Sequence, residues 1–166
     1  KELSKKLRCR RYSTGDFMRE MAAKRGVDIL KLNVIAESDE TIDYTIDSWA
    51  KKLWNTEDNF VIDSRLAFHF IPNSFKVFLT ADLPARAKRI FQDKRTTEQH
   101  TTLTALKKFM KEREASELKR YMKLYGVDYY DVKNYNLVID TTKKSVSEAV
   151  EMILDRVKKK RLNWEN

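Results

Sequence analysis

Apolar and polar side chains alternate at helical spacing along most of this chain. Between Asp39 and Trp54, for example, apolar residues recur at intervals of three and four, which places Ile42, Ile46 and Leu53 on one helix face. Similar patterns with start and stop residues at their ends predict the other helices. Helices are expected over residues 1–7, 14–24, 27–36, 39–54, 64–70, 84–94 and 104–124, followed by a final helix from Ser145 or Ser147.

Short apolar runs separate these helices and are typical of β-strands. The run Phe60–Ile62, which ends at Asp63, has the continuous apolar character of a buried parallel strand. Strands are expected at residues 9–12, 60–63, 76–80 and 136–140, the first of them with a weaker pattern because it is rich in arginine. Strands that alternate with helices predict an α/β fold, a parallel β-sheet flanked by helices.

Polar residues follow several of these strands, where ligands of parallel sheets usually bind. Asp63 ends one strand, Thr80-Ala-Asp82 ends another, and Ser13–Arg19 follows the arginine-rich strand. Because the carboxyl ends of parallel strands share one edge of a sheet, we expect these segments to lie close together. Residues 95–101 are polar and rich in threonine, which suggests a mobile loop.

Composition fits one domain of 166 residues with long helices, since the chain holds 3 Gly and 2 Pro. The one cysteine, Cys9, excludes an internal disulfide framework and a cysteine-based zinc site, and it suits a reducing cytoplasm. No membrane-spanning run or signal peptide is expected. The net charge of +9 suggests a polyanionic partner, either nucleotide phosphates or nucleic acid, and charge alone does not separate the two.

The segment Ser13–Arg19 has the residues of a phosphate-binding helix start. Ser13 or Thr14 can cap the helix, Gly15 allows close backbone approach, and Asp16 suits the positive end of the helix dipole. Arg19, one turn later, can hold a phosphate through two parallel hydrogen bonds. The alternative is an ordinary capped helix with a surface arginine.

Two further sets could carry chemistry. Asp63, at a strand end, can orient Mg²⁺ through water or simply cap a helix, and Arg65 adds a cation beside it. Arg113, Glu117 and Arg120 are spaced at i, i+4 and i+7, so they share one helix face. They could form a surface salt bridge, or they could present two cations from a lid that closes over a transferring phosphate.

Several of these segments together resemble a known family. Ser13–Arg19 is similar to the Ser-Thr-Gly-Asp-x-x-Arg motif that binds the acceptor in nucleoside monophosphate kinases. Arg113–Tyr121, Leu124–Asp128 and Tyr135–Thr141 resemble, in order, the Arg-Glu-x-Ser-Glu-x-x-Arg-Tyr, Tyr-Gly-Ile-Asp and Tyr-Asp-Leu-Val-Ile-Asp-Thr segments of archaeal-type cytidylate kinases. Phe78–Arg89 matches as well, so the resemblance covers essentially the whole chain.

The resemblance implies an enzyme that transfers the γ-phosphoryl group of ATP, with Mg²⁺, to a pyrimidine monophosphate. It implies an acceptor-binding region at residues 14–58, a helical lid at about residues 93–124, no direct metal ligand, and a cytoplasmic monomer without membrane or nucleic-acid partners. By resemblance, the residues that hold the acceptor are Thr14, Gly15, Asp16, Arg19, Arg65 and Glu117. The residues that act on the phosphates during transfer are Arg113, Arg120 and Asp63, the last of them through water to Mg²⁺. Arg89 contacts the donor adenine.

The sequence departs from the family pattern in two places. The loop Gly-x-x-Gly-x-Gly-Lys-Ser/Thr, which cradles donor phosphates, is not found, and Lys1–Leu7 resembles the helix that follows it. We therefore expect the first strand and this loop to be missing from the chain, disordered or cut away; the alternative is a naturally inactive relative. Ser48-Trp49 stands after Ile46-Asp47 where relatives carry arginines. CMP or dCMP is the expected acceptor, with UMP and AMP as alternatives, and a basic nucleic-acid-binding module is the other candidate function.

Overall fold

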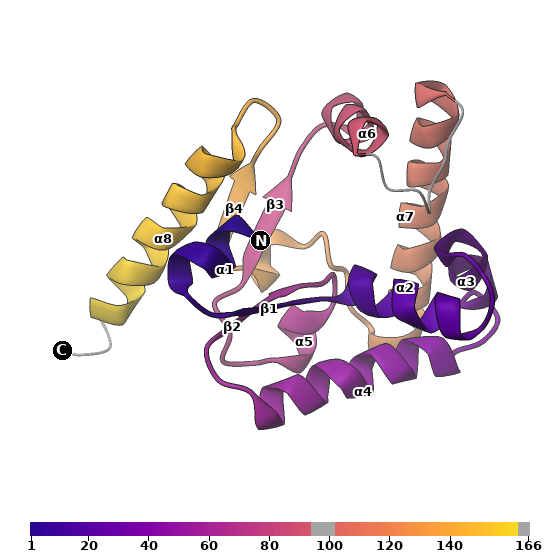
Figure 1. Ribbon diagram of the computed structural model, residues 1–166, viewed down its shortest axis with the longest axis horizontal. Coiled ribbons are helices and arrows are strands. Elements are labelled where there is room, and N and C mark those ends of the chain that lie inside the picture. Colours follow the sequence, from indigo (N-terminus) through magenta and orange to yellow (C-terminus); the bar gives the residue numbers. More distant parts are fainter. Residues whose placement is uncertain (94–101, 163–166) are drawn as a thin grey trace.

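Figure 1 shows the computed structural model, which describes residues 1–93 and 102–162. The loop expected at residues 95–101, and with it part of the expected lid, lies outside the described residues. The elements are α1 (Glu2–Leu7), β1 (Arg10–Ser13), α2 (Thr14–Lys24), α3 (Ile29–Ile35), α4 (Thr41–Thr56), β2 (Phe60–Asp63), α5 (Ala67–Phe70), β3 (Val77–Thr80), α6 (Leu83–Gln92), α7 (Leu103–Tyr125), the 3-10 helix η1 (Val132–Asn134), β4 (Leu137–Asp140) and α8 (Val146–Leu162).

The four strands run parallel in two pairs. β1 pairs with β2, with Ser13 opposite Asp63, and β3 pairs with β4, with Thr80 opposite Asp140. In each pair the two carboxyl ends therefore lie side by side, as a parallel arrangement requires. The predicted α/β fold with parallel strands flanked by helices is confirmed, although the pairs are not hydrogen-bonded into one continuous sheet.

A large cavity borders both strand pairs. It has a volume of about 2510 Å³ and is lined by every residue of β2 and β3. Apolar side chains of α1 and α8, including Leu3, Leu7, Val150 and Ile153, line it too. A further parallel strand in this space would join the pairs, since unpaired strand edges are templates for another strand. The sequence patterns had not indicated this split into two pairs.

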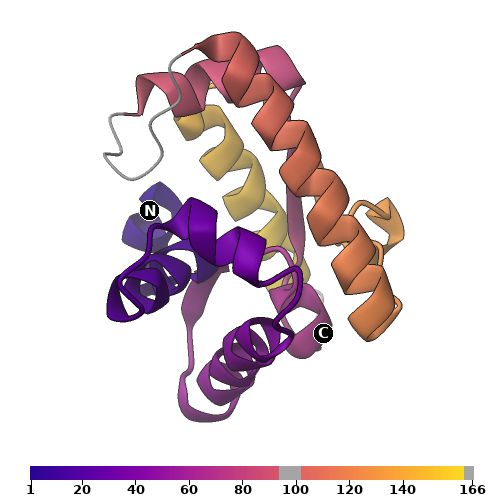
Figure 2. The same ribbon diagram turned by 90° about the vertical axis from the view of Figure 1, so that its right-hand side faces the viewer.

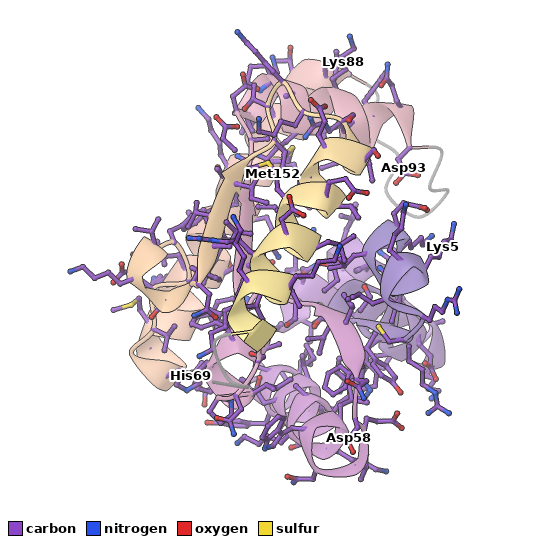
Figure 3. The ribbon with its side chains drawn as sticks, turned by 90° about the vertical axis from the view of Figure 1, so that its left-hand side faces the viewer. Lys5, Asp58, His69, Lys88, Asp93 and Met152 are labelled. Atoms are coloured by element: carbon purple, nitrogen blue, oxygen red, sulfur yellow. The ribbon has the colours of Figure 1, made fainter. Side chains whose placement is uncertain are left out.

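The helices around the strands have two separate apolar clusters. The first joins α2, α3 and α4 through Met18, Ile29, Leu32 and Ile42. The second joins α6 to α7 through Ala87, Leu106 and Met110, at the end of α7 that lies beside α6 in Figure 2. The contacts between α4 and α7, described below, are polar. Lysines such as Lys5 and Lys88 point away from the helices that carry them (Figure 3).

The helix expected over residues 64–70 is shorter than predicted. α5 begins only at Ala67 because the Ser64 hydroxyl accepts hydrogen bonds from the backbone N–H groups of Leu66 and Ala67. Such local side-chain bonds favour a turn over a helix. The turn keeps Arg65 outside regular structure, directly after β2, where its side chain can reach the other elements of the site.

Candidate active site

The start of α2 is built as the sequence predicts. The Ser13 hydroxyl accepts a hydrogen bond from the Asp16 N–H, so Ser13 is the cap. The Thr14 Oγ1 atom is buried and has no hydrogen-bond partner among the described residues. A Cβ atom at Gly15 would lie 3.5 Å from the Arg19 guanidinium, which is ordinary contact. The segment therefore presents the Thr14 hydroxyl, rather than using it as a cap.

Asp16 sits between two arginines at this helix start. It forms ion pairs with Arg19 and with Arg11, the latter at 2.9 Å. Hydrogen bonds from Arg19 and then from Arg11 lower the pKa of Asp16 to about 2. Asp16 thus stays ionised at neutral pH and orients both guanidinium groups, and Arg11 also lies 3.5 Å from Asp63. Arg11 was not identified from the sequence, where it appeared only as part of an arginine-rich strand.

Glu117 on α7 joins two of the predicted phosphate-binding residues. Its Oε1 atom accepts from Arg65 Nη1 at 2.5 Å and from Arg113 Nε at 2.9 Å. The Glu117 side chain is only 4% exposed, and its Oε2 atom is buried without a hydrogen-bond partner among the described residues. The predicted pair Arg113–Glu117 is therefore a buried contact shared with a third residue, not a surface salt bridge. One carboxylate between two guanidinium groups leaves a net positive charge.

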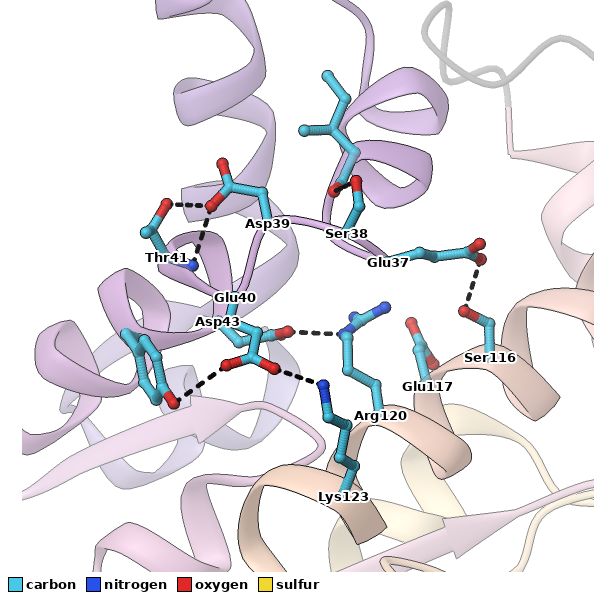
Figure 4. Close-up of polar contacts among 12 residues, drawn as sticks. Glu37, Ser38, Asp39, Glu40, Thr41, Asp43, Ser116, Glu117, Arg120 and Lys123 are labelled. Carbon is cyan, nitrogen blue, oxygen red and sulfur yellow. Dashed lines mark hydrogen bonds and ion pairs between the residues drawn. The ribbon is translucent and has the colours of Figure 1, made fainter.

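Arg120 is positioned differently from Arg113. Its Nε lies 2.6 Å from Asp43 Oδ2 on α4, and the two side chains are 9% and 4% exposed. This contact belongs to a row of acidic groups that we call the α4–α7 polar row: Glu37 with Ser116, Glu40 with Lys123, Asp43 with Arg120, and Asp47 with Tyr125. Figure 4 shows the first three of these contacts. The contact with Asp43 uses the Nε atom, and the guanidinium has further N–H donors on its two terminal nitrogens, so the role of Arg120 at the phosphates stays a prediction.

Asp47 is the member of the row whose charge depends on pH near neutrality. Burial raises its pKa to about 6 from 3.8, against the hydrogen bond that Tyr125 donates, and the charge of Asp43 adds to the increase. Between these two pH values, Asp47 therefore keeps its proton in the folded protein, whereas the same carboxyl group is ionised in the unfolded chain. As the pH rises through this interval, the ionising carboxylate makes folding less favourable.

We expect Asp47→Asn to relieve this penalty. Asparagine can still accept the Tyr125 hydrogen bond but cannot ionise. Relative to the parent chain, the melting temperature of the variant should rise more at about pH 7.5 than at about pH 4.5. Thermal unfolding of both proteins at the two pH values measures this. An equal difference at both pH values would show that Asp47 does not titrate in this interval.

Two predicted residues lie at the ends of the strand pairs. Asp63, at the end of β2, has a side chain that is 75% exposed, with one oxygen 3.5 Å from Arg11. Oxygen ligands and water suit Mg²⁺, so this exposed carboxylate fits the expected water-mediated role. Arg89 on α6 donates to the Thr141 carbonyl oxygen at 2.6 Å, which places it after β4. In residues 1–93 and 102–162, no three metal-binding side chains gather as ligands of one ion.

All the predicted site residues line the same large cavity. They are Thr14, Gly15, Asp16, Arg19, Asp63, Arg65, Arg89, Arg113, Glu117 and Arg120. Asn33, Asp43 and Asp47 line it as well and were not identified from the sequence. Each is a polar residue beside or within the apolar pattern of its helix, and that is the signal by which they could have been noticed.

No helix of the described part of the chain has the length and apolar composition needed to cross a membrane.

Comparisons with known proteins identify relatives of this chain. A model of the cytidylate kinase-like family matches residues 1–143. A cytidylate kinase of Methanosarcina acetivorans is 35% identical over 144 residues, covering 85% of this chain and 78% of the relative. One of Sulfolobus acidocaldarius is 33% identical over 166 residues, covering 98% and 88%. The crystal structure of an uncharacterized protein from Eubacterium ventriosum shares the fold, with a TM-score of 0.62, 22% identity and coverage of 95% and 87%.

Proposed function

This chain belongs to the cytidylate kinase-like family, and we propose that it binds CMP or dCMP as acceptor of the γ-phosphoryl group of ATP. The observation that carries the proposal is the convergence of Arg19, Arg65 and Arg113 on one cavity. These cations come from α2, from the turn after β2 and from α7. Positive groups around a cavity of this kind suit phosphate oxygens, which arginine binds with paired hydrogen bonds.

In the proposed reaction, an oxygen of the acceptor phosphate attacks the γ-phosphorus of ATP. The bond between that phosphorus and the oxygen bridging it to the β-phosphate breaks, and ADP leaves with the electron pair. No side chain forms a covalent intermediate, so the protein contributes positioning and charge stabilisation. Arg19 and Arg65 would hold the acceptor phosphate, and Arg113 would stabilise the charge on the transferring group.

Glu117 would act by positioning in this mechanism. It holds Arg65 and Arg113 together through its Oε1 atom, while its unpartnered Oε2 atom is available for a donor on the acceptor, such as a ribose hydroxyl. Cations that are already in place need little reorganisation during the transfer. This small reorganisation is the main source of electrostatic catalysis.

On the donor side, Arg89 would pack on the adenine, and Asp63 would hold Mg²⁺ through water. When bound, Mg²⁺ would neutralise part of the negative charge on the phosphates of ATP. The glycine-rich loop that would cradle those phosphates is not found in these residues. We therefore propose that the described residues form mainly the acceptor half of the site.

Isothermal titration of the 166-residue chain with CMP, UMP, AMP and ATP tests this proposal. We expect CMP to bind at one saturable site and ATP to bind weakly. If the chain is folded by circular dichroism and none of the monophosphates binds, the proposed acceptor site is wrong.

A further inference from the structure

Asn33 on α3 is a polar residue in the wall of the cavity that no expected role uses. Its Nδ2 atom donates a hydrogen bond to the Ile29 carbonyl oxygen at 2.8 Å. Its Oδ1 atom is buried and has no hydrogen-bond partner among the described residues. Both Asn33 and Ile29 line the cavity, together with Thr14 and Arg19 of the neighbouring helix α2.

The hydrogen bond to Ile29 fixes which end of the Asn33 amide acts on a ligand. A backbone carbonyl can only accept, so the NH₂ group must face it, and the amide oxygen must be the atom left over. Asn33 therefore directs its amide oxygen, an acceptor, away from the Ile29 carbonyl, and the second N–H of the NH₂ group is held on the Ile29 side of the amide. Turning the amide round would place two oxygen atoms against each other.

Other polar atoms of this cavity have the same character. Glu117 Oε2 is also a buried acceptor without a hydrogen-bond partner, and Thr14 Oγ1, likewise unpartnered, can donate or accept. A buried acceptor that lacks a donor is unfavourable by about 1–3 kcal/mol. A ligand with N–H or O–H groups relieves this cost, whereas a ligand that presents a carbonyl oxygen at the same place adds repulsion.

We propose that Asn33 accepts a hydrogen bond from the exocyclic amino group of the acceptor base, and so selects a base with an amino group over one with a carbonyl group. Cytosine has this amino group, and uracil has an oxygen in its place. A phosphate at Asn33 is disfavoured because its negative oxygens would repel the amide oxygen. The inference rests on the proposed function, because it assigns the base end of the same acceptor site.

Titration of the full chain with CMP and UMP, before and after Asn33→Ala, tests the assignment. We expect the parent chain to bind CMP about 10-fold more tightly than UMP. Asn33→Ala should remove this preference, because CMP loses its hydrogen bond and UMP, freed from the repulsion of the amide oxygen, is not weakened. Asn33→Leu removes the same acceptor with a side chain of similar size and should have the same effect. Asn55→Ala, an exposed asparagine of α4 outside the cavity lining, is the matched control and should change neither affinity.

The outcomes separate the two claims. Equal weakening of CMP and UMP by Asn33→Ala, or no change in either, would overturn the role of Asn33 while leaving the acceptor site in place. A folded parent chain that binds neither nucleotide would overturn the proposed function and this inference with it. If Asn33→Ala fails to fold, the comparison passes to Asn33→Leu, and a retained preference for CMP in that folded variant would contradict the proposal.

Discussion

Replacing Arg120 by alanine is expected to lower the free energy of unfolding by about 3–5 kcal/mol. Its guanidinium lies 2.6 Å from Asp43, and both side chains are at least nine-tenths buried. Alanine would leave the Asp43 carboxylate buried without its cation, and burial already raises the pKa of Asp43 despite Arg120. Urea denaturation of the variant and the parent chain measures the loss.

Two companion variants show whether the buried pair is the cause. The double variant Asp43→Leu with Arg120→Met removes both charges and should recover most of the stability. Lys123→Ala breaks an exposed contact of the same α4–α7 polar row and should cost less than about 1 kcal/mol. A loss below about 1 kcal/mol for Arg120→Ala itself would contradict a structural role and favour the phosphate contact that the resemblance implies.

Arg19→Ala is expected to weaken CMP binding by about 10- to 100-fold while leaving the fold intact. Hydrogen bonds to a charged group contribute about 1.5–3 kcal/mol, which corresponds to this range of affinity. The stability should change little because Asp16, one ion-pair partner of Arg19, is 54% exposed and keeps Arg11. Isothermal titration with CMP and thermal unfolding measure the two effects separately.

Arg156→Ala is the matched control for this experiment. Arg156 is an exposed arginine of α8 that does not line the cavity, so its loss removes the same charge from the chain at another place. An equal loss of CMP affinity in both variants would mean that general charge, not the α2 site, attracts the nucleotide. Unfolding of Arg19→Ala would support the alternative of an ordinary structural helix.

The elements of this fold follow closely from local sequence patterns. The ranges expected for α2 and β2 agree with the structure, because a serine cap, an apolar face and a short β-rich run each fix a boundary locally. The convergence of the predicted residues on one cavity also follows from the sequence, because parallel strands bring their carboxyl ends to one edge. The split into two strand pairs was not predicted, since hydrogen bonding between strands depends on what fills the space between them.

The partners of the charged residues could not be predicted. Arg120 and Asp43 are distant in the chain, and helical periodicity shows which face a residue occupies but not which element covers that face. Asp43 follows Ile42 on α4 and looks like a solvent-facing acid until α7 is placed against it. The orientation of the Asn33 amide likewise depends on one hydrogen bond that only the folded helix shows.

The most direct test of the central claim is phosphoryl transfer by the natural protein that contains this chain. The protein is incubated with Mg·ATP and CMP, and the products are followed by phosphorus NMR. The account predicts that CDP and ADP form in equal amounts and that UMP reacts more slowly. A folded protein that binds CMP but forms no CDP, or that releases only ADP and inorganic phosphate, would contradict it.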